Sequence, residues 1–320
     1  IWRAANELRG AVDGWDFKQY MLGFLFYRFI SENLTSYINQ QEHQAGNTDF
    51  DYASISDDAV KSAVGMRDEV IKDKGFFIYP SQLFVNVRQR ADKDPDLNQT
   101  LSQIFDAIEG SAKGTDSERD MAGLFDDVDL DNSRLGRTVS DRNDKLVKIL
   151  NTIGDLPLGD YRENQIDAFG DAYEYLINMY ASNAGKSGGE FFTPQEVGEL
   201  LARIVIGDKK QVNKVYDPAC GSGGLLLKFA KILGKDNVLN GYYGQDSNPT
   251  IYNLARYNMF LHDINFSKFN IAYGDTLINP QHWDDEPFDA IVSNPPYSVK
   301  WEGDANPVLI NDQRFSPAGV

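Results

Sequence analysis

The pattern of apolar and polar residues changes character near residue 214. Before that point, apolar residues recur at the three-to-four-residue spacing that places them on one face of a helix. Helices are predicted over 17–30, 57–73, 81–92, 96–110, 141–152, 164–182 and 194–206. The helix over 17–30 is apolar on nearly every side, which indicates a buried helix. Ser81 and Asp141 are expected N-caps, and the acidic, Gly-containing stretch 116–131 is expected to form a loop.

After residue 214, short apolar runs alternate with helical patterns. Strands are predicted at 215–216, 240–245, 270–273 and 288–293, and helices at 225–233 and 249–261. Strands that alternate with helices predict a parallel, doubly wound sheet. We therefore expect an α-helical domain over 1–162, followed by an α/β domain of Rossmann-like architecture over 163–320.

The net charge of −17 disfavours a protein that grips nucleic acid unaided, because phosphate contacts need basic side chains. The charge is uneven, however. Residues 1–180 hold 19 basic and 32 acidic side chains, a net of −13, whereas residues 181–320 hold 12 and 16, a net of −4. The acidic surplus therefore belongs mainly to the expected helical domain.

The single cysteine, Cys220, excludes a disulfide framework and a cysteine-based zinc site, and the three histidines lack HExxH spacing, so no metal site is predicted. We find no apolar run of about 20 residues and no signal peptide. No membrane contact and a reducing, cytoplasmic location are therefore expected. The chain starts without Met and stops in a loop-like stretch, so we expect it to be part of a longer polypeptide.

A Gly-rich segment, Asp217-Pro-Ala-Cys-Gly-Ser-Gly-Gly224, follows the first predicted strand and opens a helix. In an open α/β sheet, ligands bind outside the carboxyl ends of the strands. The glycines alone are explained equally well by a tight strand-to-helix turn. A dinucleotide site is disfavoured because Leu226 stands where a small residue is needed, and a P-loop at Gly185-Lys-Ser187 fails because Tyr180 replaces its leading glycine.

The segment from Asp217 to Gly224 resembles motif I of S-adenosylmethionine-dependent methyltransferases, and Asn294-Pro-Pro-Tyr297 resembles their motif IV, which is catalytic in amino-methyltransferases that act on DNA. Gly189-Glu-Phe-Phe-Thr-Pro194 resembles motif X. The wording from Gly185 to Pro194, the tail 298–320 and the start 13–20 are similar to the modification (M) subunit of type I restriction-modification systems. This resemblance covers almost the whole chain.

The resemblance implies S-adenosyl-L-methionine as the cofactor. The implied cofactor-binding residues are Glu190, Phe191, Phe192, Thr193, Asp217, Ala219, Gly221, Ser222, Gly223, Asp246 and Asp275. Asp217 would orient the ammonium group, Asp246 the ribose hydroxyls, and Asp275 the adenine amine. The family commonly has Glu where Asp246 stands. Structural alternatives are a turn cap for Asp217, helix N-caps for Asp246 and Thr193, and a plain loop acid for Asp275.

The implied catalytic residues are Asn294, Pro295, Pro296 and Tyr297. The exocyclic amine of adenine is a poor nucleophile, and the Asn294 oxygen and the Pro295 carbonyl can accept its hydrogen bonds. Tyr297 offers a face on which a flipped-out base can stack. A strand terminator is the structural alternative for the two prolines.

These residues favour methylation of adenine N6. Methylation at cytosine C5 needs a nucleophilic Cys, usually after Pro, whereas Cys220 follows Ala219; N4-cytosine enzymes more often begin the catalytic motif with Ser. The alternative functions are methylation of protein glutamine or of ribosomal RNA guanine through the same motif, and a catalytically silent assembly subunit.

The family also implies partners: double-stranded DNA, a specificity (S) subunit, a second M subunit and a restriction (R) subunit. Its sheet has seven strands, so we expect the later strands beyond Val320. We therefore expect the 320-residue segment to be unstable alone, because one edge of its sheet would be open.

Overall fold

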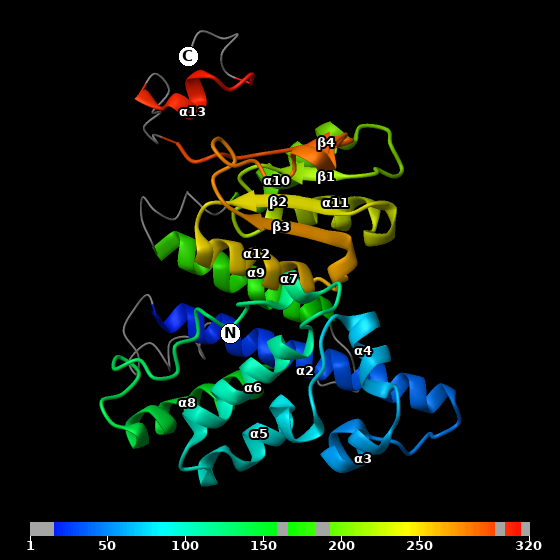
Figure 1. The fold of residues 1–320 in the computed structure, drawn as a ribbon, viewed down its shortest axis with the longest axis vertical. Helices are drawn as coiled ribbons and strands as arrows, with labels where there is room; N and C mark the ends of the chain where they lie inside the picture. The colour runs from blue at the N-terminus through cyan, green and yellow to red at the C-terminus, as the bar shows by residue number, and fades with distance from the viewer. Residues whose placement is uncertain (1–15, 159–165, 184–192, 298–304, 315–320) are drawn as a thin grey trace. The chain divides into compact units, whose positions relative to one another are not determined.

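The computed structural model describes residues 16–158, 166–183, 193–297 and 305–314. Within it, the chain forms two compact units. The first comprises residues 1–176 with 260–267, and the second comprises 177–259 with 268–320. Figure 1 shows the helices of the first unit in blue to green and the strands of the second in green to orange. No helix in the described ranges is long and apolar enough to cross a membrane.

The first unit is built from helices. Their bounds are α2 Asp16–Gln44, α3 Asp57–Ser62, α4 Met66–Lys74, α5 Phe84–Arg90, α6 Leu97–Ser111, α7 Glu118–Met121, α8 Val139–Gly154 and the first part of α9 Ile166–Asn183. The long helix α2 lies in the centre and packs against α5 and α8. Its side chains from Tyr20 to Ile30 are all buried, which confirms the expected buried helix for the described residues.

Aromatic rings fill the core beside α2. Phe105 of α6 stacks on Phe125 with ring centroids 4.1 Å apart, and it also meets the edges of Phe24 and Tyr27. Arg28 is a buried charged residue in this core. Its Nε pairs with the Glu32 carboxylate at 2.6 Å, and its Nη1 donates to the carbonyls of Ile153 and Leu156 at 2.7 and 3.1 Å, at the end of α8. The ion pair therefore balances the charge, and the remaining donor meets acceptors that a helix terminus leaves unpaired.

The structure corrects three local predictions in this unit: one helix and two helix N-caps. The helix predicted over 57–73 is broken, because Gly65 adopts a left-handed conformation with φ of +84° between α3 and α4. Asp141 does not cap α8; Thr138 is the N-cap, and Asp141 completes a capping box three residues later. Ser81 lies inside a short 3₁₀ turn and hydrogen-bonds Asp57, so it is not the cap of α5.

The stretch 116–131 is also more ordered than expected. It contains the short helix α7, and five of its apolar side chains are buried in the first unit although the segment is acidic. These side chains are Met121, Leu124, Phe125, Val128 and Leu130. The acidic residues therefore cover a packed segment instead of marking a solvated loop.

The second unit contains a parallel sheet. Its strands are β1 Val215–Asp217, β2 Tyr242–Asp246, β3 Phe269–Tyr273 and β4 Ala290–Ile291, in the order β3-β2-β1-β4. Figure 1 shows the arrows side by side in this order. Val215 of β1 pairs with Tyr242 of β2 on one side and with Ala290 of β4 on the other. The expected parallel α/β sheet after a helical domain is confirmed.

Helices connect and cover the strands of this unit. Their bounds are α10 Gln195–Ile206, α11 Gly224–Leu233, α12 Pro249–Leu261 and the short α13 Pro307–Ile310. Helix α11 packs on β1 and β2, and α10 packs on α11. Since β2 and β4 lie on opposite sides of β1, the strand order reverses between β1 and β4. Ligands of open α/β sheets bind at such a switch point.

Candidate active site

The switch point brings the two predicted motifs together. Asp217 is the last residue of β1, and the Asn294–Tyr297 motif begins three residues after β4. The Val292 N–H donates to the Tyr216 carbonyl at 3.0 Å, so the chain leaving β4 runs beside the end of β1. The two motifs, which are far apart in the sequence, therefore lie at the same edge of the sheet.

Asp217 is a buried carboxylate at this edge. Its side chain is only 1% exposed, and its Oδ1 accepts a hydrogen bond of 3.1 Å from the Ala219 N–H. Burial raises the pKa of Asp217 to about 7, and the negative charge of Asp246 acts in the same direction. The bond to Ala219 fits the turn-capping alternative. Because ionisation of Asp217 is unfavourable in this environment, a positively charged ligand group beside it would stabilise the ionised carboxylate.

The Gly-rich turn after β1 needs glycine at two positions. Gly221 and Gly223 have φ of +55° and +78°, which side chains with a Cβ rarely adopt. A Cβ on Gly223 would also lie 2.9 Å from the Met259 Cε atom of α12. Ser222 is buried, and its carbonyl accepts a hydrogen bond of 2.9 Å from the Asn258 side chain. The turn is therefore close-packed against α12.

Cys220 in this turn is disfavoured as a nucleophile. Its thiol is buried, and burial together with the charges of Asp217 and Asp246 raises the pKa of the thiol well above its usual range. A thiol that stays protonated cannot attack a base, which agrees with the expectation that C5 methylation is disfavoured.

Asp246 ends β2 and is half-buried. Its Oδ2 accepts from the Gly221 N–H at 3.1 Å and its Oδ1 from the Asn248 N–H at 2.9 Å. Burial raises the pKa of Asp246 as well. The capping alternative does not hold, because Asn248 accepts from the N–H groups of Thr250 and Ile251 at the start of α12. Asp246 instead joins the end of β2 to the Gly-rich turn.

Asp275 lies in the loop after β3 and is exposed. Its Oδ1 accepts from the Leu277 N–H at 2.8 Å. Two contacts tie this loop to the residues above: the Gly274 N–H donates to the Asp246 carbonyl at 2.9 Å, and the Thr276 hydroxyl donates to the Pro218 carbonyl at 2.5 Å. Asp275 therefore stands beside the same edge.

Asn294 is half-buried and held from both sides of its amide. Its Nδ2 donates to the Thr193 hydroxyl at 3.2 Å, and its Oδ1 accepts from the Tyr297 hydroxyl at 3.0 Å. Tyr297 is 78% exposed, and Pro295 and Pro296 are exposed too. Thr193 does not cap α10, because Pro194 is the N-cap residue; its hydroxyl serves Asn294 instead. Glu190, Phe191 and Phe192 lie outside the described residues.

Two family models match the chain. The HsdM N-terminal domain matches residues 1–153, and the N-6 DNA Methylase domain matches residues 164–320. The type I restriction enzyme MpnII methylase subunit of Mycoplasma pneumoniae is 50% identical over the whole chain and 61% of its own length. The MjaIX methylase subunit of Methanocaldococcus jannaschii is 25% identical over 98% of the chain and 53% of its own length.

The chain belongs to the type I restriction enzyme methylase subunits. A solved structure agrees: the methyltransferase subunit of a type I restriction-modification system from Streptococcus thermophilus superposes with a TM-score of 0.82, at 28% identity. The match covers 99% of this chain and 66% of that one. The family resemblance inferred from the motifs is confirmed. The chain spans 61% of the length of its Mycoplasma relative.

The carboxylates at this sheet edge have the chemistry needed to hold S-adenosylmethionine. Burial raises the pKa of both Asp217 and Asp246, and the charge of Asp246 adds to the cost of ionising Asp217. A ligand that brings an ammonium group and hydroxyl donors relieves both costs. The residues present therefore fit this cofactor.

Sequence reasoning missed three side chains of this methylase fold. Gln245 and His282 are buried, and Arg314 donates to the carbonyls of Thr276 and Leu277 at 3.0 and 2.5 Å. His282 bonds the Gly244 carbonyl and the Asp285 carboxylate at 2.9 and 2.8 Å. The available signal was Gln245 itself, a long polar residue at the end of the predicted strand 240–245. The partners of the other two are set by tertiary structure.

Proposed function

We propose that this chain is the catalytic portion of a site-specific DNA methyltransferase subunit that uses S-adenosylmethionine to methylate the N6 amine of a flipped-out adenine. The observation that carries the proposal is the Thr193–Asn294–Tyr297 hydrogen-bond chain, set at the same sheet edge as Asp217 and Asp246. Family membership supports it, since one of the matching models describes N-6 DNA methylases.

Bound S-adenosylmethionine would supply an activated methyl group for direct displacement by the adenine nitrogen. Asp217 holds the ammonium group, and Asp246 accepts hydrogen bonds from the ribose hydroxyls. Asp275 accepts from the adenine amine of the cofactor. Gly221 and Gly223 let the backbone approach closely, and Ala219 and Ser222 belong to the same turn. We assign Glu190, Phe191, Phe192 and Thr193 to cofactor binding as well, because motif X has that role in the family.

Asn294 prepares the target amine. Its Oδ1 keeps one lone pair after the bond from Tyr297, and Thr193 holds the amide nitrogen, so the oxygen is fixed in direction. That oxygen and the Pro295 carbonyl accept the two N–H groups of adenine, which draws electron density onto the nitrogen. When the nitrogen gains the methyl group, the amine would lose one proton to solvent, and S-adenosylhomocysteine would be the leaving product. Catalysis rests on positioning and electrostatics.

Tyr297 stacks on the extruded base. Its ring is 78% exposed, as a side chain must be to receive a base from a duplex. Pro295 and Pro296 keep the backbone of the motif stiff and remove N–H donors that would compete for Asn294. The hydroxyl bond from Tyr297 to Asn294 couples the base-stacking ring to the amine-binding amide.

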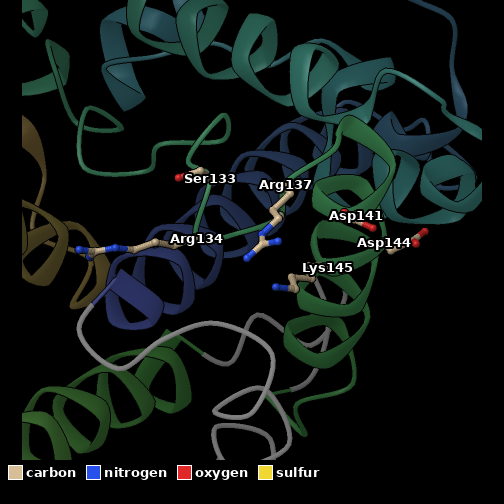
Figure 2. A pocket seen from close by; sticks show the side chains of 7 residues that line it. Ser133, Arg134, Arg137, Asp141, Asp144 and Lys145 are labelled. Atoms are coloured by element: carbon tan, nitrogen blue, oxygen red, sulfur yellow. The ribbon is translucent and has the colours of Figure 1, made fainter.

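The helical domain offers a surface for DNA phosphates. A cavity of about 470 Å³ lies before and along α8, lined by Arg134, Arg137 and Lys145 and by Asp141 and Asp144. Figure 2 shows Arg137 and Lys145 pointing toward the same space, with Asp141 and Asp144 on α8 beside Lys145. Within an acidic domain, the small surplus of basic residues in this cavity, which we call the basic face, suits a phosphate backbone.

The remaining assignments follow the family. We place the boundary between helical and methyltransferase domains at residues 162 and 163, between the two family matches, which end at 153 and begin at 164. Sequence recognition belongs to a specificity subunit, a second copy of the methylase subunit and a restriction subunit complete the complex, and the complex works in the cytoplasm. Weak intrinsic DNA affinity is consistent with the net charge of −17.

Mass spectrometry of the methylated product tests this function. The full-length protein, with its specificity partner, is incubated with DNA and labelled S-adenosylmethionine, and the digested nucleosides are analysed. N6-methyladenine supports the proposal. Methylated glutamine or guanine in control incubations with protein or ribosomal RNA, without methylated DNA, would contradict it. Failure to bind S-adenosylmethionine in calorimetry would instead indicate a silent assembly subunit.

A further inference from the structure

Gln245 is a fully buried amide whose side chain bonds only backbone groups of one loop. Its Nε2 donates to the carbonyls of Gly274 and Asn279 at 3.0 and 2.8 Å, and its Oε1 accepts from the Gln281 N–H at 3.0 Å. Both hydrogens of the amide nitrogen are used, and the oxygen is used once. The side chain thus spans the loop 274–281 from its first residue to its last.

Other contacts also hold the loop 274–281. The Gly274 N–H bonds the Asp246 carbonyl, the Thr276 hydroxyl bonds the Pro218 carbonyl, and Arg314 donates to the carbonyls of Thr276 and Leu277 at 3.0 and 2.5 Å. The backbone of Gly274 lies close to this amide. Its φ is +143°, and a Cβ there would lie 3.3 Å from the Gln245 Nε2 atom. Three of the polar contacts that hold the loop therefore come from one side chain.

Asp275 is carried by this loop, one residue after the first carbonyl that Gln245 binds. Among the residues that the structure describes, the Asp275 side chain hydrogen-bonds within the loop, to the Leu277 N–H at 2.8 Å. Its position relative to β2 consequently depends on the loop as a whole. Displacing the loop would move Asp275 while leaving Asp217 and Asp246 on their strands.

We propose that Gln245 is a positioning residue that holds Asp275 in place and thereby sets the preference of the cofactor site for an unsubstituted adenine amine. This inference rests on the proposed function, in which Asp275 accepts a hydrogen bond from that amine. Removing the Gln245 amide takes a hydrogen-bond partner from the Gly274 and Asn279 carbonyls and from the Gln281 N–H, so the loop shifts to find other partners. The shift weakens the recognition of the adenine amine by Asp275.

The test compares two ligands in the full-length protein by calorimetry: S-adenosylhomocysteine and its analogue with an N6,N6-dimethylated adenine, which has no amine hydrogen. We expect the wild type to prefer S-adenosylhomocysteine by about tenfold or more, because a hydrogen bond to a carboxylate is lost with the analogue. In Gln245→Met the preference should fall to within about threefold. A ratio of two dissociation constants does not depend on the folded fraction, so loss of stability alone leaves it unchanged.

Gln281→Ala is the matched control. This glutamine lies on the same loop and is exposed, and the substitution keeps the backbone N–H that Gln245 binds. The preference of the Gln281→Ala variant for S-adenosylhomocysteine over the dimethylated analogue should equal that of the wild type. If Gln245→Met cannot be purified, Gln245→Asn makes the same comparison, because its amide is one methylene too short to reach the two carbonyls.

Different binding results would contradict the role of Gln245 and the proposed cofactor site. Loss of preference in the Gln245 variants, with preference kept in Gln281→Ala, supports the positioning role. A Gln245 variant that keeps the wild-type preference overturns it. A wild-type protein that binds both ligands equally overturns the role of Asp275 and the inference with it. A wild-type protein that binds neither ligand overturns the proposed cofactor.

Discussion

The Thr193 hydroxyl accepts a hydrogen bond of 3.2 Å from the Nδ2 atom of Asn294, although the two residues are 101 positions apart in the sequence. This bond links the segment before α10 to the chain that leaves β4. Because the amide nitrogen is engaged, the amide oxygen points away from Thr193, where it accepts from Tyr297. Thr193 thereby decides which end of the Asn294 amide is offered to a substrate.

Replacing Thr193 by Val should lower kcat for DNA methylation by about fivefold, because the freed amide loses its fixed direction and a typical hydrogen bond contributes about 1 kcal/mol. Thr193→Ser keeps the hydroxyl and should retain most of the wild-type kcat. Steady-state kinetics at saturating cofactor and DNA checks this. Equal kcat values for the Val variant and the wild type would show that Thr193 does not orient Asn294.

The raised pKa of Asp217 predicts pH-dependent cofactor affinity. The folded protein holds this proton up to about pH 7, whereas an unfolded Asp releases it near pH 4, so this group lowers the stability of the ligand-free protein as pH rises between those values. A ligand whose ammonium group pairs with ionised Asp217 must first displace the proton below pH 7. Binding of S-adenosylhomocysteine should therefore tighten by about tenfold from pH 6 to pH 8.

Calorimetry at both pH values measures this effect, and Asp217→Asn is the control. The amide has no proton to displace, so the affinity of this variant, although weaker, should not change with pH in that range. A wild-type dissociation constant that stays the same from pH 6 to pH 8 would mean that Asp217 does not meet the ammonium group.

The basic face of the helical domain predicts a change in salt dependence. Removing Arg137 and Lys145 together should weaken DNA binding uniformly across sequences and make the slope of log K against log salt less negative by about 1.8, since each phosphate contact contributes about 0.9. Fluorescence anisotropy at several salt concentrations measures the slope in the assembled complex.

The matched control for that experiment removes Lys61 and Arg67. Both are exposed basic residues of the same unit, and each is already paired with an acid, Asp58 at 3.4 Å and Asp68 at 3.7 Å. Their loss should leave the slope unchanged. An equal change of slope in both double variants would show a general charge effect and no phosphate site in the cavity.

The sequence predicted the arrangement of the second unit well because its motifs stand at the ends of strands. In a parallel sheet those ends share one edge, so the motifs of Asp217, Asp246 and Asn294 had to meet once the strands were recognised. Helix α12 has the bounds that its pattern predicted, 249–261. Local signals were weaker where two residues competed for one role, as when Thr138 and not Asp141 became the cap of α8.

Side chains whose partners are backbone atoms of distant loops could not be predicted. Gln245 bonds carbonyls that lie 29 and 34 residues away, and no spacing rule connects them. Arg28 similarly finds its acceptors at the end of a helix 125 residues later. In both cases burial of a polar group forces a partner to exist, but only the folded chain determines which one it is.

The measurement that tests the central claim most directly is the sequencing of methylated positions in DNA from cells that carry the complete operon, with wild-type or Asn294→Ala protein. For the wild type, we predict N6-methyladenine at one recurring recognition sequence. For Asn294→Ala, whose target amine has lost its side-chain acceptor, we predict that this methylation disappears while S-adenosylhomocysteine still binds. Adenine methylation that continues at the wild-type level in the variant would contradict the account.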